Sequence, residues 1–517
     1  MESEALRATE TALGDLPGVV RAAVMIRQSR PAGPELIAYI LPDDEYVQRA
    51  FSSPTDEAQR TEQWRKIFDL YQKPTFGQSM EMGFGSHVWK SAYTKQPIPD
   101  HEMQEWIGCT LDRIKQLHPN KVLDIGCGLG ALLLQLGPKC DRYVGTDISG
   151  RSIAALKDRI RAFPGKWQSI TLLERAADDF EGFVDGSFDT VIINSVCQYF
   201  PSVEYLTKVM LGAMRMARPN GTIFVGDVRS LPLRPSFAVS VEMFQAPSGL
   251  SLDELRLRVH KRLKLEKELL ISPSYFLALE RMFPEICRIE ILPKRGLCDN
   301  EMNRFRYDVL IRFGSSTKRH IELSWLDWSD NKLTFDLIDQ QLRHQKPEIL
   351  AINAIRNERI EKDNFALEIL SGKGEFPNLT ELREALTNMV TCGVHPERML
   401  SLADELGYRM DFSWASCRSD GSYDVVFYKP DNRLQRLGIT FNWPAPNYLS
   451  RDLAYHVADP VRNAHRSKFV RYLRDSTLLK LGERAAPADF VVLDAVPTTS
   501  SGSIDRSALP LPWLSDL

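Results

Sequence analysis

The sequence predicts an α/β protein built on a doubly wound, Rossmann-like parallel sheet. The first observation is an apolar segment, residues 122–125, followed by Gly126, Gly128 and Gly130 and then by residues 131–136, which begin a helix. The second is a series of later segments with strand character, at residues 142–146, 169–173, 188–193 and 222–227. A strand, a glycine turn and a helix in this order form a nucleotide-sized pocket, because a Cβ in the turn would hold a ligand away from the backbone.

Acidic residues follow the predicted strands at positions that suit an adenine nucleoside. Asp147 ends the second strand, where a carboxylate can accept hydrogen bonds from both ribose hydroxyls. Asp178 follows the third segment and suits an adenine amino group. The glycine turn lies between Asp124 and Asp147 and explains why both positions are acidic.

Length and composition exclude several classes of protein. The chain has 517 residues, too many for one compact core, so two or three folded units are expected. It is 43% hydrophobic with a formal net charge of -3, so neither nucleic acid nor an anionic membrane is an expected partner. The 9 histidines form no H-x-x-x-H pair and the 8 cysteines no C-x-x-C pair, so neither a metal site nor a disulfide framework is expected. The acidic residues 1–4 do not begin a signal peptide, and the expected location is the cytoplasm.

The two ends of the chain predict halves of one small unit. Residues 5–16 have the pattern of an amphipathic helix, and strands are expected at residues 20–27 and 35–41. This segment is too short to bury a core by itself. The strand expected at residues 490–497 is its candidate partner.

These ends resemble the adenylation domains of nonribosomal peptide synthetases. Residues 498–510 are similar to the string P-L-T-P-N-G-K-V-D-R-x-A-L-P that closes the small carboxyl-terminal subdomain of that family, and residues 16–19 are similar to its start. The resemblance implies one subdomain split in two with another domain in the gap, as in interrupted adenylation domains. Ser503 replaces the family's lysine that engages the carboxylate, and the large ATP-binding subdomain is absent, so adenylation is not expected.

The middle of the chain resembles the S-adenosylmethionine-dependent methyltransferases that are embedded in these synthetases. The loop D-I-G-C-G-x-G at residues 124–130 differs from the G-x-G-x-x-G of dinucleotide dehydrogenases. Four longer strings typical of the family occur at residues 89–99, 194–202, 225–231 and 304–309. The resemblance implies a class I methyltransferase core with an additional C-terminal α/β segment, flanked by halves of a small α+β adenylation-type subdomain.

The predicted division of the chain has four parts. They are the first half of the adenylation-type subdomain, a linker helix, the methyltransferase domain and the second half of the subdomain, at residues 1–43, 44–84, 85–432 and 433–517. Inside the methyltransferase part, residues 237–270 are expected to form charged helices. The additional segment is expected to contain strands at residues 347–353 and 423–428 and helices at residues 379–389 and 396–406.

The resemblance implies S-adenosylmethionine as the cofactor. The residues expected to bind it come from the glycine turn, the strand ends and the string at residues 89–99. They are Tyr93, Asp124, Gly126, Cys127, Gly128, Gly130, Asp147, Ile148, Ala177, Asp178, Asn194 and Ser195.

Methyl transfer from a sulfonium needs alignment more than activation. An α-amine has a reference pKa of about 7.7–8.0, so part of it is neutral near neutral pH without a strong base. Asp227 is the candidate acceptor of the amine proton, and Arg229 is the candidate that positions it. The residues expected to face or enclose the acceptor are Asn194, Gln198, Tyr199, Tyr93 and Arg306.

Each of these residues also has a structural interpretation. Asp227 could cap the turn after its strand, Tyr199 could be a core aromatic, and Arg306 could be the partner in a structural ion pair. Trp89 and Tyr93 could form a hydrophobic lid that takes no part in the chemistry.

The function implied by the resemblance is N-methylation of the α-amine of an aminoacyl or peptidyl thioester. The expected partners are the carrier protein that holds this thioester and other synthetase domains, including the large adenylation subdomain. Side-chain O- or C-methylation is the alternative within the family. A non-catalytic docking scaffold is the alternative from another class, and cofactor binding would distinguish it.

Overall fold

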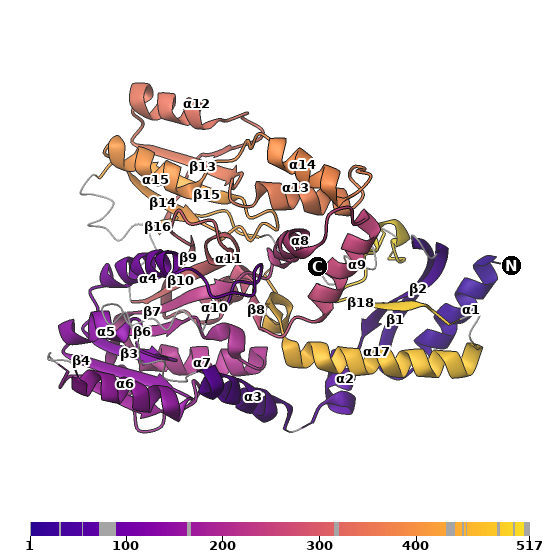
Figure 1. Ribbon diagram of the computed structural model, residues 1–517, viewed down its shortest axis with the longest axis horizontal. Helices are drawn as coiled ribbons and strands as arrows, with labels where there is room; N and C mark the ends of the chain where they lie inside the picture. The colour runs from indigo at the N-terminus through magenta and orange to yellow at the C-terminus, as the bar shows by residue number, and fades with distance from the viewer. Residues whose placement is uncertain are drawn as a thin grey trace.

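A sheet of seven strands forms the centre of the computed structural model, in the order β5-β4-β3-β6-β7-β10-β9 (Figure 1). The structure describes residues 2–29, 33–53, 55–71, 89–162, 167–314, 320–430, 440–446, 449–450, 452–482, 486–499 and 502–510. The strands of this sheet are β3 (Lys121–Ile125), β4 (Arg142–Asp147), β5 (Ile170–Glu174), β6 (Phe188–Asn194), β7 (Ala217–Arg229), β9 (Ile286–Pro293) and β10 (Arg306–Phe313).

The direction and order of these strands confirm the predicted doubly wound fold. The strands from β5 to β7 are parallel, and β10 runs antiparallel to both β7 and β9. The chain reverses its direction of growth between β3 and β6, and doubly wound sheets bind ligands at such a switch point. One antiparallel strand near the far edge is the arrangement expected of a class I methyltransferase.

Both faces of the sheet are covered, because adjacent residues of each parallel strand point to opposite sides. Val122 and Tyr143 lie in one core cluster with helices α4 (Asp100–Lys115) and α6 (Gly150–Ala162). Their neighbours Leu123 and Val144 lie in a second cluster. That cluster contains residues of α7 (Val203–Met216) and α10 (Pro273–Met282).

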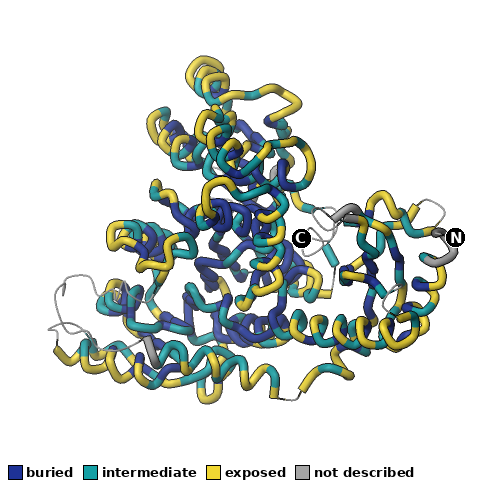
Figure 2. The backbone as a smooth tube through the Cα atoms, turned by 45° about the vertical axis from the view of Figure 1, so that its right-hand side comes forward, coloured by how far each residue is buried: buried dark blue, intermediate teal, exposed yellow. Residues whose placement is uncertain are grey.

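The additional α/β segment forms a four-stranded sheet in the order β12-β13-β15-β14. Its elements are β12 (Trp325–Asp327), α12 (Phe335–Gln340), β13 (Ile349–Ile355), α13 (Glu361–Leu370), α14 (Leu379–Asn388), α15 (Pro396–Glu405), β14 (Arg409–Ser413) and β15 (Tyr423–Tyr428). Its buried residues join the cluster on one face of the central sheet, and the amide of Trp414 donates to the carbonyl of Ile291 at 3.0 Å. The buried core therefore runs from one unit into the other (Figure 2).

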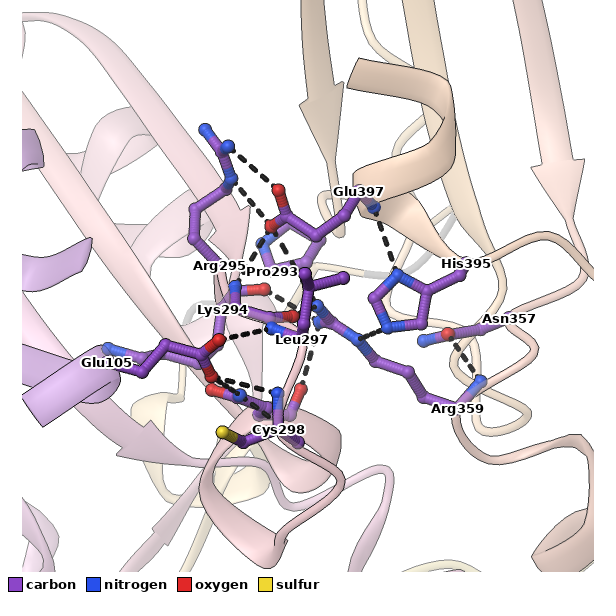
Figure 3. A network of polar contacts seen from close by, with 12 residues as sticks. Glu105, Pro293, Lys294, Arg295, Leu297, Cys298, Asn357, Arg359, His395 and Glu397 are labelled. Atoms are coloured by element: carbon purple, nitrogen blue, oxygen red, sulfur yellow. Dashed lines mark hydrogen bonds and ion pairs between the residues drawn. The ribbon is translucent and has the colours of Figure 1, made fainter. Parts of the chain in front are cut away.

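A polar network around Arg359 fastens the additional segment to the central sheet (Figure 3). The guanidinium donates to the carbonyls of Lys294 and Gly296 at 2.7 and 2.6 Å and to His395 Nε2 at 3.1 Å. The amide of Glu397 donates to the other ring nitrogen at 3.2 Å. Burial, and then the Arg359 charge, lower the pKa of His395 to about 4, so the ring is neutral in the folded protein.

The two ends of the chain meet in a three-stranded sheet, in which β2 (Gly33–Pro42) pairs with β1 (Val19–Ser29) and in parallel with β18 (Asp489–Val492). Two helices, α1 (Glu2–Gly14) and α17 (Pro460–Leu481), contribute Leu13 and Phe469 to the core of this unit. The identity of the unit as a split adenylation-type subdomain remains a proposal. The boundaries predicted at 84/85 and 432/433 lie outside the described residues.

Three elements differ from the sequence prediction. The helix after the glycine turn, α5 (Leu133–Leu136), is a single turn, because a 3₁₀ turn with Pro138 follows it. Strand β7 already begins at Ala217, before residue 222, where the sequence predicts its start. β18 ends at Val492, before the predicted residue 497.

Two further helices, α8 (Arg234–Gln245) and α9 (Leu252–Lys264), line a groove that is described below. The sequence predicts charged helices at residues 237–270; α9 falls within this range, and α8 begins before it, at Arg234. No helix among the described residues is long and apolar enough to cross a bilayer.

The half-buried ring of His395 makes the free energy of unfolding depend on pH. The ring has a pKa of about 4 when folded and about 6.5 when unfolded, so the unfolded chain binds the proton first as the pH falls. The free energy of unfolding should therefore decrease between pH 6.5 and 4. His395→Asn keeps a side chain that can cap α15 and should reduce this loss by about 1 kcal/mol, less than the full shift because the ring is half-buried.

Urea denaturation at pH 7 and pH 5 measures this difference. His344→Asn is the control, because His344 is exposed. Equal pH dependence in the wild type and His395→Asn would contradict the assignment.

Candidate active site

A cavity lies at the carboxyl ends of β3, β4 and β6, at the switch point of the sheet. The described residues that line it come from the glycine turn, the strand ends and the helix α3 (Asp56–Tyr71). They are Thr61, Trp64, Phe68, Trp89, Trp106, Asp124, Gly126, Cys127, Gly128, Leu129, Ala131, Leu132, Asp147, Ile148, Ser152, Arg175, Ala177, Asn194, Ser195, Val196, Tyr199, Phe200, Pro201 and Tyr205.

The glycine turn shapes the floor of this cavity. Gly126 and Gly128 have φ angles of +76° and +52°, which side chains rarely adopt. A Cβ on Gly126 would lie 2.4 Å from Val196, whereas a Cβ on Gly128 would meet no protein atom within 4 Å. Gly128 therefore leaves open the space that a ligand needs to approach the backbone.

Two carboxylates, the buried Asp124 and the partly buried Asp147, face the same cavity. Asp147 accepts hydrogen bonds from the amides of Gly128 and Ser149 at 2.9 and 2.8 Å. Asp124 accepts one from the Tyr143 hydroxyl at 2.8 Å, and burial raises its pKa to about 7. Burial also raises the pKa of Asp147. No ion pair to either carboxylate is found among the described residues, so a cationic ligand would stabilise both.

The loop after β6 supplies polar atoms at one side of the cavity. Asn194 Oδ1 is buried and has no hydrogen-bond donor within the described structure. A Cβ on Gly226 would lie 2.2 Å from this oxygen, so glycine is required opposite it. Ser195 follows with a φ of +58°, an unfavourable conformation for serine that indicates a constraint from its surroundings.

An aromatic wall closes the cavity on another side. Trp64 and Phe68 of α3 pack against Tyr199, with ring centroids 4.7 and 4.9 Å apart. Asp69 fixes α3 by accepting hydrogen bonds from Ser149 Oγ at 2.7 Å and, through its carbonyl, from Arg151 at 3.0 Å. The sequence prediction treated this helix only as a linker. The available signal was the pair of aromatics four residues apart in a polar helix, which share one face.

Asp227 lies behind the cavity and does not line it. Its side chain is fully buried, and it has a φ of +61°. One carboxylate oxygen, Oδ2, accepts from Ser195 Oγ at 2.8 Å and from Arg306 at 2.6 Å, and the other accepts from Trp106 Nε1 at 3.1 Å. Among the described residues, Ser195 and Trp106 are the two that bond this carboxylate and also line the cavity.

A second, smaller hollow lies on the far side of Asp227. The described residues that line it are Arg229, Ser230, Arg234, Phe237, Leu270, Glu301, Phe305 and Arg306. Arg229 pairs with Glu266 and Glu268 at 2.9 and 2.7 Å, not with Asp227. Arg306 is therefore the basic residue that the structure brings to the Asp227 carboxylate.

The other expected site residues have partners elsewhere. Tyr93 bonds Ser240 at 3.0 Å and Arg304 at 3.3 Å, and burial raises its pKa to about 12. Asp178 accepts from Tyr205 at 2.9 Å and from Lys208 at 2.6 Å, and Tyr205 in turn lines the cavity.

The structure places the expected residues in three groups. Those that line the cavity are Asp124, Gly126, Cys127, Gly128, Asp147, Ile148, Ala177, Asn194, Ser195 and Tyr199. Asp227, Asp178 and Gln198 each bond a lining residue, Gln198 by donating to Ser195 at 3.2 Å, and Gly130 lies in the chain between the lining residues Leu129 and Ala131. Arg229, Arg306 and Tyr93 do not line it; the two arginines line the second hollow.

Comparison with known proteins agrees with the fold. A family model described as a methyltransferase domain matches residues 123–223. The chain is 35% identical over 528 residues to chondramide synthase cmdD of Chondromyces crocatus, covering 98% of this chain and 13% of that protein. It is 30% identical over 505 residues to a probable non-canonical nonribosomal peptide synthetase, CymA, of Salinispora arenicola, covering 97% of this chain and 6% of that protein. The chain thus spans a small part of these relatives.

Solved structures were also compared. The N-methyltransferase NodS of Bradyrhizobium japonicum is 15% identical, with a TM-score of 0.28, covering 42% of this chain and 100% of that chain. Because this TM-score is low, the fold assignment depends on the strand order described above.

The residues of the cavity fit S-adenosylmethionine, the cofactor expected from the sequence. Gly128 opens space beside the backbone, and Asp147 stands where a ribose is expected. The unpaired carboxylates suit a molecule that carries an ammonium and a sulfonium charge. Asn194 Oδ1, which has no hydrogen-bond donor among the described residues, can accept a hydrogen bond from the cofactor or from the methyl acceptor.

Removal of the Asp147 charge should weaken cofactor binding. Asp147→Asn loses charge-assisted hydrogen bonds to ribose hydroxyls, so the Kd for S-adenosylmethionine should rise by about tenfold or more. Isothermal titration calorimetry measures this change. Asp158→Asn is the control, because Asp158 is largely exposed on α6 and away from the cavity. An unchanged Kd for Asp147→Asn would exclude the ribose role.

The aromatic wall from α3 should contribute to binding as well. Trp64→Ala removes apolar surface and an aromatic contact with Tyr199, so the Kd for S-adenosylmethionine should rise several-fold. Lys66→Ala on the same helix is the control, since its side chain is 69% exposed. Equal Kd values for the two variants, measured by the same titration, would show that α3 does not form part of the binding site.

Proposed function

The chain belongs to the S-adenosylmethionine-dependent methyltransferase domains of nonribosomal peptide synthetases, and from this premise we propose that it N-methylates the α-amine of an aminoacyl or peptidyl thioester on a carrier protein. The carrier protein and neighbouring synthetase domains are the proposed partners, and the cytoplasm is the proposed location. The two ends of the chain, as halves of an adenylation-type subdomain, would join the domain to the synthetase.

The observation that carries the choice of acceptor is the scarcity of bases around the cavity. Among the described residues that line it there is no histidine, lysine or glutamate, and Asp124 and Asp147 are assigned to the cofactor. The lone pair of a neutral amine is already a good nucleophile, whereas a hydroxyl becomes one only as it loses its proton, and a carbon acceptor must also lose a proton. The cavity therefore favours a nitrogen acceptor over side-chain O- or C-methylation.

The residues of the cavity have distinct roles in this reaction. S-adenosylmethionine supplies a methyl group on a positively charged sulfur, so the leaving group is already activated. Asn194 Oδ1 has no hydrogen-bond donor among the described residues, so it accepts an N–H of the amine. This hydrogen bond orients the amine so that the nitrogen lone pair points at the methyl carbon. The wall of Trp64, Phe68 and Tyr199 excludes water and encloses the reacting atoms. Alignment of this kind can provide a large part of the rate.

The proton that the amine must release has a path to Asp227. As the new N–C bond forms and the C–S bond breaks, the nitrogen becomes positively charged and gives up a proton. Ser195 Oγ lies at the cavity and donates to Asp227 Oδ2 at 2.8 Å, so it can pass the proton to this carboxylate. Before the transfer this carboxylate is paired with Arg306, whose guanidinium lies 2.6 Å from the same oxygen.

Methylation by the whole chain tests the proposal. The protein is incubated with S-adenosylmethionine and a carrier loaded with a panel of aminoacyl thioesters, and the released amino acid is fragmented by mass spectrometry. One added methyl group on the α-nitrogen is expected. The N-acetylated thioester, which has no basic amine, should remain unmethylated. A methyl group on oxygen or carbon would overturn the choice of acceptor, and cofactor binding without any product would favour a scaffold.

Asp227→Asn should separate chemistry from binding in the same assay. The amide cannot take the proton but keeps one oxygen that can accept from Ser195 and Arg306, so kcat should fall by about a hundredfold while the Kd for S-adenosylmethionine stays close to the wild-type value. The retained Kd also shows that the variant is folded. An unchanged kcat would exclude Asp227 as the proton acceptor.

A further inference from the structure

A charged groove on α8 and α9 adjoins the hollow behind Asp227. The described residues that line it are Arg234, Phe237, Ala238, Glu242, Arg258, Lys261, Arg262, Leu263, Leu265 and Glu266. We propose that this groove binds the phosphate of the phosphopantetheine arm that carries the thioester, and that the arm enters the methyltransferase along it. The inference rests on the proposed function and names the route of its substrate.

One buried carboxylate organises the basic side of the groove. Glu242 of α8 is 6% exposed and accepts hydrogen bonds from Arg258 Nε at 2.9 Å and Arg262 Nε at 2.7 Å. Lys261 is exposed and lies three residues after Arg258, on the same side of α9. Since a single acidic group holds two guanidiniums beside a lysine, this part of the groove keeps a positive charge.

The acidic residue at the other end of the groove does not cancel this charge. Glu266 is engaged with Arg229, whose guanidinium it meets with two hydrogen bonds at 3.0 and 2.9 Å. The free positive charge is therefore concentrated on α9, at the solvent side. A fixed group of arginines with a lysine is the arrangement that binds phosphate oxygens.

The groove continues toward the reacting atoms. It shares Arg234 and Phe237 with the smaller hollow, whose inner side is formed by Arg306. Arg306 and Ser195 both bond the same oxygen, Asp227 Oδ2, and Ser195 lines the cofactor cavity. A single carboxylate therefore separates the end of this path from the cofactor cavity.

The distribution of charge along the path matches a tethered arm. A phosphopantetheine thioester has its negative charge at the phosphate, next to the carrier, and its reacting amine at the opposite end. The path has its positive charge at the surface and the Asp227 carboxylate at its inner end, which suits an amine. Lys264 of α9 lies 3.7 Å from Asp489 of β18, so α9 lies beside the unit formed by the two chain ends (Figure 1).

The test compares two small thioesters of one amino acid with the whole protein. One is the aminoacyl phosphopantetheine thioester, and the other is the aminoacyl pantetheine thioester, which lacks only the phosphate. Lys261→Glu should lower kcat/KM for the first by about tenfold, mainly through KM, and leave the second unchanged. The same loss is expected with the loaded carrier protein. Lys157→Glu, an equal charge reversal at an exposed position of α6, should affect none of them.

Each outcome decides the matter. Equal losses for both small thioesters, or no loss for either, would overturn the phosphate site. A loss with the carrier protein alone would show that Lys261 contacts the carrier surface instead of the phosphate, which also overturns it. Failure of the wild type to methylate any of the three substrates while binding S-adenosylmethionine would instead remove the proposed function, and the inference with it.

Discussion

The carboxylate of Asp227 is the interaction on which the rest of the methyltransferase unit depends. It joins four elements, because β7 carries it and it accepts donors from α4 through Trp106, from the loop after β6 through Ser195 and from β10 through Arg306. Burying a charge costs several kcal/mol unless it is paired and fully hydrogen-bonded. The three donors meet this condition only if all four elements hold their positions, so the carboxylate fixes the edge of the cavity.

A second buried carboxylate supports the first. The backbone amide of Asp227 donates to Asp308 Oδ1 at 2.8 Å. The Asp308 carboxylate also bonds Lys294 at 2.9 Å and pairs with Arg113 of α4. Lys294 is only 1% exposed, so it too depends on this pairing. Arg359 of the additional α/β unit donates to the backbone carbonyl of Lys294 (Figure 3). The active-site edge and the interface between the two units thus belong to one connected set of buried polar groups.

Much of the sheet and the glycine turn could be predicted from the sequence, because both depend on local patterns. The apolar strands, the spacing of Gly126 and Gly128 and the acidic strand ends lie within short stretches of chain, and the cavity forms where they meet. The wall from α3 and the partners of Arg229 could not be predicted. Trp64 meets Tyr199, and Arg229 meets Glu266 and Glu268, only after distant segments pack, and one sequence does not specify such pairings.

The pairing of β2 with β18 has a consequence for how the protein forms. Ile37 lies opposite Asp489 and Ile40 opposite Val492, so the last strand of the small sheet is made only after all the residues that separate it from β2. Contacts between residues so far apart in sequence carry a large entropic cost unless the intervening chain has already become compact. On the ribosome, the first half of this sheet must therefore wait with an unpaired edge until the inserted domain has folded and brought its partner strand within reach.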